Sequence, residues 1–113
     1  MKLNDFTSET FKDEMFYIRP KIHCNDGFIF SVQGSDGHYS TPRKNVKEFM
    51  QMEIGFPNQV EELILEFAED KDNPTETVYA YVDNKLIQQV IDKHGGIDVN
   101  KTLNGFDDYE VIE

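Results

Sequence analysis

The sequence predicts an α+β fold: a single domain, residues 1–113, built from a mainly antiparallel sheet of four to five strands with two helices packed on one face. Three observations predict it. Several short β-rich runs are bounded by turn residues, two stretches have apolar residues at helical spacing, and nine Phe and five Tyr supply an aromatic core. A chain of this length can bury roughly two thirds of its unfolded surface.

The clearest strand signal is a β-hairpin centred on Asp26–Gly27. Asp-Gly between apolar runs favours a tight turn. The run before it, Met15–Cys24, contains Pro20, which cannot donate a ladder hydrogen bond, so this strand should lie at an edge or be broken there. In the returning strand, Phe28–Val32, every second residue is apolar and should face the core.

The stretch Met50–Val82 holds the longest apolar periodicity. A half-buried strand, Met50–Phe56, comes first, with Met50, Met52, Ile54 and Phe56 on its apolar face. A helix should follow, with Asn58 as N-cap and Glu61 at the capping-box position. Its apolar residues lie at helical spacing and predict one buried stripe: Val60, Leu63, Ile64 and Phe67.

The strand after this helix is Thr77–Val82, the most β-prone run in the chain. It is either antiparallel to Met50–Phe56 or parallel to it through a right-handed crossover. A second helix should begin at Asp83 or Asn84 and end at Gly95–Gly96, because a helix C-terminus favours left-handed residues.

Charge is distributed unevenly along the chain. The net charge is −11, but residues 15–47 carry +3 while residues 48–113 carry −12. This balance argues against nucleic acid or an anionic membrane as a direct partner. A single cysteine, the lack of a long apolar run and the acidic N-terminus indicate a protein of the cytoplasm.

Carboxylates on the first predicted helix and after it form the most distinctive surface. No lysine from the helix relieves their mutual repulsion, and such a local conflict more often marks function than a neutral face does. The candidate partner-binding residues are Glu62, Glu66, Glu69, Asp70 and Asp72, with Asp107, Asp108 and Glu110 from the C-terminal segment. A solvated face that only keeps the protein soluble is the alternative.

Four runs of the sequence resemble a family of small proteins encoded by tailed bacteriophages: Asp26–Arg43, the run ending in Pro57, Asn73–Val82 and Ile91–Ile97. The resemblance covers roughly residues 17–97. It implies phage origin, and because the family has no assigned activity it transfers no catalytic residues to this chain. Ser40 stands where the family pattern has a cysteine after His-Tyr. By analogy, acidic phage proteins include inhibitors of host defence such as anti-restriction and anti-CRISPR proteins.

Other sites have weaker sequence support. His23, Cys24 and His38 could hold zinc, or Cys24 could act as a nucleophile with His38 or His94, but neither the ligand number nor any signature fits. No cofactor or metal is expected. A basic–aromatic patch with the residue types of an RNA site is a further alternative: Arg19, Lys21, Arg43, Lys44 and Lys47 with Tyr17, Phe28 and Tyr39.

The favoured hypothesis is a non-enzymatic phage accessory protein in the host cytoplasm. Its acidic, nucleic-acid-mimicking face would bind the basic surface of a host protein or ribonucleoprotein defence complex. Two alternatives remain: a self-associating structural or housekeeping phage protein, which includes a homodimer, and a small metal-binding protein or enzyme centred on His23, Cys24 and His38.

Overall fold

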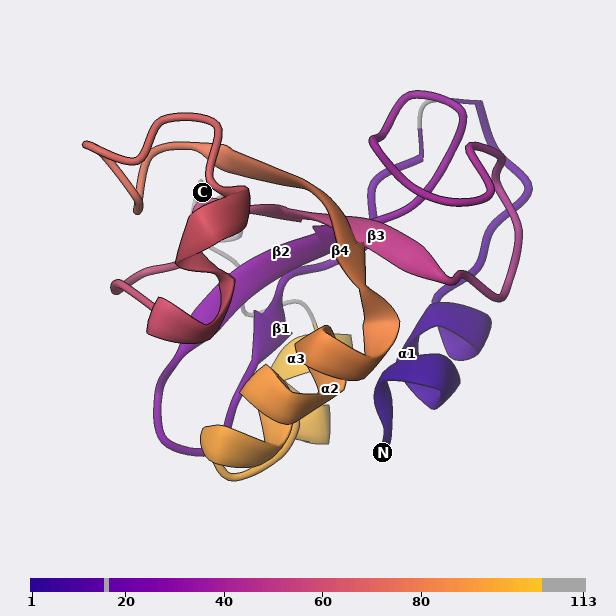
Figure 1. Cartoon of the computed structure of the whole chain (residues 1–113). Helices are drawn as coiled ribbons and strands as arrows, with labels where there is room; N and C mark the ends of the chain where they lie inside the picture. The colour runs from indigo at the N-terminus through magenta and orange to yellow at the C-terminus, as the bar shows by residue number, and fades with distance from the viewer. Residues whose placement is uncertain (16, 105–113) are drawn as a thin grey trace, which may run out of the picture.

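Four antiparallel strands form one sheet in the order β1-β2-β3-β4 in the computed structural model, which describes residues 1–15 and 17–104 (Figure 1). The strands are β1 (Ile22–His23), β2 (Ile29–Gln33), β3 (Gln51–Gly55) and β4 (Val78–Asp83). The predicted α+β fold with its antiparallel sheet is confirmed. The parallel alternative for the last two strands is wrong, since β3 and β4 pair antiparallel.

The hairpin of β1 and β2 is confirmed at its turn but shortened at its start. Gly27 has a φ of 97°, a value that favours glycine, and the Cys24 N–H donates to the Phe28 carbonyl at 2.8 Å. Among the described residues of the predicted strand Met15–Cys24, only the two residues of β1 form a strand. As expected from Pro20, this strand lies at one edge of the sheet.

The side chains on one face of the sheet are buried in the hydrophobic core. The alternating residues of β2 and its turn, Phe28, Phe30 and Val32, are fully buried. In β3 only the two central apolar residues follow the prediction, because Met50 is 73% exposed and Phe56 53% exposed. Both lie just outside β3, where the two-residue alternation no longer holds, and Phe56 has a φ of 48°.

The predicted first α-helix is instead a short 3₁₀ helix, η1 (Glu62–Phe67). Its N-cap is Glu61 rather than Asn58. Because a 3₁₀ helix has three residues per turn, the predicted α-helical stripe does not form. Ile64 is buried and Phe67 partly so, but Val60 is 54% exposed and Leu63 40% exposed.

The α-helices are α1 (Leu3–Glu9), α2 (Asn84–Lys93) and α3 (Val99–Leu103). The second predicted helix is thus confirmed as α2: the Asp83 side chain accepts from the Lys85 N–H, and Gly95 and Gly96 follow with φ near 90°. Figure 1 shows α1 beside α2, and buried side chains of α1, α2 and η1 join the core formed by the sheet.

Arg19 connects the N-terminal part to the long β2–β3 connection. Its side chain is buried and meets no carboxylate among the described residues. Its guanidinium and Nε instead donate to Thr10 Oγ1 and to three carbonyls, those of Thr7, Gly34 and Val46, at 3.0–3.1 Å. Burial lowers the pKa of Arg19. One side chain therefore fixes three segments that are distant in sequence.

Candidate functional site

The acidic surface lies on η1 and on the loop between η1 and β4. All five predicted carboxylates of this region are exposed, and Glu76 at the end of the same loop is exposed as well. We use "acidic surface" for these six residues: Glu62, Glu66, Glu69, Asp70, Asp72 and Glu76. The other predicted partner-binding residues, Asp107, Asp108 and Glu110, lie outside the described residues.

Opposite charges do not neutralise this surface within the described residues. None of its six carboxylates takes part in an ion pair there, and Lys71 is the one basic residue of the segment from η1 to β4. Exposed carboxylates held close together repel one another, and a partner carrying Lys or Arg would relieve that repulsion. The surface is therefore suited to a cationic partner.

The loop between η1 and β4, which carries four of the six acidic residues, is held by its own hydrogen bonds. Asp70 accepts at both carboxylate oxygens, from the Asp72 N–H at 3.1 Å and from Asn73 Nδ2 at 3.0 Å. The Asp70 N–H donates to Thr77 Oγ1, and the Tyr79 hydroxyl donates to the Pro74 carbonyl at 2.6 Å. Asp70 thus shapes the loop, a role that the sequence prediction did not give it.

Glu61 is the N-cap of η1, which carries part of the acidic surface, but its own side chain is buried. Its carboxylate is 1% exposed, and Oε2 accepts from the Leu63 N–H at 3.0 Å and from Lys93 Nζ at 2.8 Å. Oε1 meets His94 Nε2 at 2.6 Å. Burial would raise the pKa of Glu61, but the hydrogen bonds from Lys93, Leu63 and His94 outweigh it, and the pKa is lowered.

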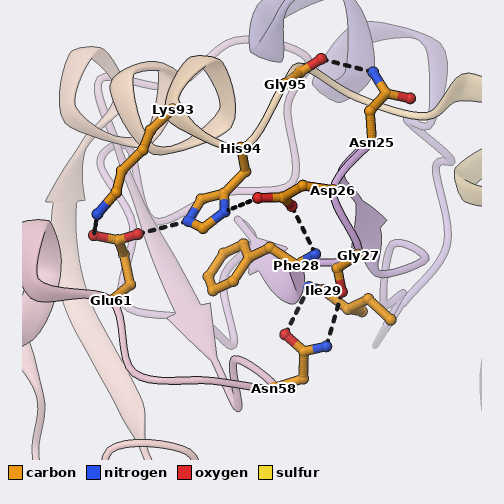
Figure 2. A network of polar contacts seen from close by, with 10 residues as sticks. All are labelled: Asn25, Asp26, Gly27, Phe28, Ile29, Asn58, Glu61, Lys93, His94 and Gly95. Atoms are coloured by element: carbon orange, nitrogen blue, oxygen red, sulfur yellow. Dashed lines mark hydrogen bonds and ion pairs between the residues drawn. The ribbon is translucent and has the colours of Figure 1, made fainter.

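His94 joins this carboxylate to the β1–β2 turn (Figure 2). Its Nδ1 meets Asp26 Oδ2 at 2.6 Å, and its ring stacks on Phe28 with centroids 4.1 Å apart. The hydrogen bond from the Phe28 N–H, followed by that from His94, lowers the pKa of Asp26. Both carboxylates are thus ionised near neutral pH. His94 thus bridges two carboxylates from distant segments, one through each ring nitrogen.

Asn58 fixes the segment before η1 to the same turn. Its Nδ2 donates to the Gly27 carbonyl and its Oδ1 accepts from the Ile29 N–H, both at 2.9 Å (Figure 2). The amide is therefore engaged with the hairpin, which is why Asn58 does not cap a helix as predicted. Asn58 and Glu61 together anchor both the entry to η1 and its first turn.

Exposed apolar side chains border the acids. Val60 and Leu63, which the sequence placed in the core, have 54% and 40% of their surface exposed. Glu62 lies between them in the chain, and Glu66 follows Leu63 by one 3₁₀ turn, so Leu63 and Glu66 share a face. Carboxylates mixed with exposed aliphatic groups are typical of a protein-binding surface rather than of a purely solvating one.

The candidate metal and nucleophile residues are not assembled into a site. His23 and Cys24 are buried at β1, whereas His38 lies in the β2–β3 connection, hydrogen-bonded to Ser35. Burial and the nearby Asp26 raise the pKa of Cys24 to about 12, so its thiolate is scarce at neutral pH. Within residues 1–15 and 17–104, no three His, Cys, Asp or Glu side chains could hold a metal ion.

The predicted basic–aromatic patch does not form as a set, because Arg19 and Phe28 are buried. Part of it remains exposed in the β2–β3 connection, where the Arg43 guanidinium lies 5.3 Å from the centre of the Tyr39 ring. Lys44 and Lys47 are exposed nearby in the sequence. Arg43, Lys44 and Lys47 thus place exposed positive charge on the β2–β3 connection, which is not part of the acidic surface.

Comparison with known proteins gives no further guide: no protein-family model, no curated protein and no solved structure matches this chain. In the part of the chain that the structure describes, no helix is long and apolar enough to cross a membrane.

Proposed function

We propose that this chain is a non-enzymatic phage accessory protein that acts in the cytoplasm of the bacterial host. It binds the basic surface of a host nucleic-acid-binding defence complex, of anti-CRISPR or anti-restriction type, through the acidic surface. The observation that carries the proposal is the set of six exposed carboxylates without ion pairs among the described residues.

Two features favour binding over mere solubility. The carboxylates are displayed on backbone that is held in place, by the Glu61 cap at η1 and by the hydrogen bonds around Asp70 in the loop. A preformed surface loses little conformational entropy when it binds. Val60 and Leu63 add apolar area that a partner would bury. Phage origin and a defence complex as partner rest on the sequence resemblance and its analogy.

The proposal is tested by reversing charge at Glu62, Glu66 and Glu69 together, each to Lys. The matched control reverses three exposed acids elsewhere, Glu9, Glu14 and Glu48, which changes the net charge equally. Both variants and the wild type are expressed in bacteria that carry a restriction or CRISPR system, and the plating efficiency of a targeted phage is measured. Affinity capture at low and high salt identifies the bound complex.

The wild type and the control should raise plating efficiency and retain one basic partner whose binding weakens steeply with salt. The variant with Lys at positions 62, 66 and 69 should neither raise plating efficiency nor retain the partner, while its circular dichroism spectrum stays that of the wild type. Equal activity of the two variants would show that the acidic surface is not the binding site. If the wild type protects against none of the defence systems, the proposed function is wrong.

A further inference from the structure

Two exposed aromatic residues have backbone conformations that normally favour glycine or asparagine. Phe56 has a φ of 48° and Tyr81 a φ of 52°, and their surfaces are 53% and 40% exposed. A bulky side chain in this region strains the backbone. Burial compensates for this strain only in part, because both side chains are exposed. Aromatic rings at strained, exposed positions point to a role outside folding.

Both residues flank the face of the sheet that points away from the core. Phe56 borders a hollow of about 220 Å³, whose floor is formed by side chains of β2 and β3, among them Ser31 and Glu53. A second hollow of about 280 Å³ is lined by Ile18 and by Ser35, Asp36, Gly37 and His38 of the β2–β3 connection. Ile18 and His38 line both hollows, so the two are adjacent.

Polar groups in these hollows have unused hydrogen-bonding capacity. Glu53 accepts from the Tyr39 N–H at 3.1 Å through Oε1, and its Oε2 meets no donor in the described chain. His38 Nδ1 is bonded to Ser35 Oγ at 2.7 Å, while Nε2 has no partner among the described residues. Burial lowers the pKa of His38, so the ring is neutral at pH 7. The hollows thus offer an acceptor and a neutral imidazole.

Further aromatic and basic groups lie beside the hollows, because Tyr39 follows His38 in the chain and its N–H donates to Glu53. The Tyr81 N–H donates to the Tyr39 carbonyl at 3.1 Å, and the two rings lie 5.8 Å apart at 42°. The Arg43 guanidinium packs on the Tyr39 ring, and exposed Lys44 and Lys47 follow in the same connection. This connection belongs to residues 15–47, the one part of the chain with a net positive charge, +3.

We propose that this face binds a nucleotide. Its base lies against Phe56 and Tyr39, with Glu53 and His38 facing its polar edge, and its phosphate contacts Arg43. The hollows are small beside the roughly 300–1,000 Å³ of ordinary ligand pockets, so each fits one ring rather than a whole ligand. A planar ring next to an anion matches exposed aromatics next to cations in an otherwise acidic protein.

The nucleotide can be free or part of a single strand, since both present the same base and phosphate. This site shares no residue with the acidic surface. Figure 1 shows the β2–β3 connection and the loop before β4 at opposite ends of the sheet, and of the site residues Phe56 comes nearest that loop, since its N–H donates to the Thr77 carbonyl at 3.0 Å. The inference therefore goes beyond the proposed function and stands or falls separately.

The test is an NMR titration of ¹⁵N-labelled full-length protein with four probes: adenosine 5′-monophosphate, uridine 5′-monophosphate, inorganic phosphate and a single-stranded hexanucleotide. Phe56→Gly removes one ring at a position whose φ suits glycine, so the fold is kept. Tyr39→Ala removes the second ring. Leu63→Ala, an exposed apolar residue of η1, is the matched control, and Arg43→Glu is compared with Lys85→Glu.

Nucleotides at millimolar concentration should shift amide signals in β2, β3 and the connection between them. Loss of one stacking ring should weaken binding roughly fivefold to 150-fold, whereas the Leu63 and Lys85 variants should bind as the wild type. A hexanucleotide that binds much more tightly than a mononucleotide identifies single strands as the ligand, and equal affinity identifies free nucleotides. Either outcome supports the site.

Three results would overturn the proposal. The first is the absence of shifts with every nucleotide probe. The second is an affinity that Phe56→Gly and Tyr39→Ala leave unchanged. The third is binding of inorganic phosphate as tight as that of the nucleotides, because a base-binding site cannot treat them alike.

Discussion

Glu61 and Glu62 are neighbours in sequence with opposite surroundings, and replacing each by Ala separates folding from binding. Glu61→Ala removes the cap of η1, about 1 kcal/mol. It also removes the pair with the half-exposed Lys93, about 0.5 kcal/mol. Finally, it leaves a buried N–H of His94 without its acceptor, about 2 kcal/mol. Together these amount to about 3–4 kcal/mol of unfolding free energy.

Glu62→Ala touches none of these contacts, and because the side chain is exposed its effect on stability should stay within about 0.5 kcal/mol. Urea unfolding followed by circular dichroism measures both variants under identical conditions. A loss below about 1 kcal/mol for Glu61→Ala would refute the reasoning that this network anchors η1. So would equal losses for the two variants.

Three more predictions follow from the same contacts. Replacing Arg19 by Lys should lower the free energy of unfolding in urea by about 2–3 kcal/mol, because one ammonium cannot reach the four acceptors that the Arg19 side chain reaches. An unchanged midpoint of urea unfolding would contradict this. Phe56→Gly should leave stability in thermal unfolding unchanged or raise it by up to about 1 kcal/mol, since glycine relieves the strain at a φ of 48°. A large loss of stability would show instead that the exposed ring stabilises the fold. The pKa of Glu61 is lower in the folded protein than in the unfolded chain, where it is about 4.3. Ionised Glu61 therefore stabilises the fold above that unfolded pKa, and this stabilisation is lost as the pH falls through the pKa of the folded protein. The stability difference between wild type and Glu61→Gln should therefore shrink below about pH 4, and a constant difference would exclude the linkage.

Elements fixed by neighbours in the chain could be predicted from the sequence. The Asp26–Gly27 turn, the alternation in β2 and the end of α2 at Gly95–Gly96 all depend on residues a few positions apart. Their signals are local, so no knowledge of the tertiary structure was needed.

The segment before η1 could not be predicted in this way. The Asn58 amide is taken by the β1–β2 turn, and Glu61 is taken by Lys93 and His94 at the end of α2. These partners lie about thirty positions away in the sequence, and their contacts override a pattern that on its own favours an α-helix.

Exposure of the acidic surface was predicted correctly, because a run of carboxylates without nearby bases stays in water. The exposure of Phe56 beside the hollows was not predicted. The positive φ of Phe56 accompanies a ring that is 53% exposed at a position where the alternation predicted burial. A glycine or asparagine there would have signalled the turn, whereas an aromatic residue conceals it.

The pairing of β3 with β4 changes register between Met52 and Ile54, and this irregularity limits how copies of the chain could aggregate. β4 is an edge strand, and an open edge invites another strand to pair with it. Ala68 and Glu69 already pair with its first half, and the register shift around Tyr81 distorts the second half. At the opposite edge of the sheet, the Asp98 N–H donates to the His23 carbonyl, and the His23 N–H donates to Thr102 Oγ1. A continuous sheet across two molecules is thus disfavoured, and any homodimer would have to form through side chains.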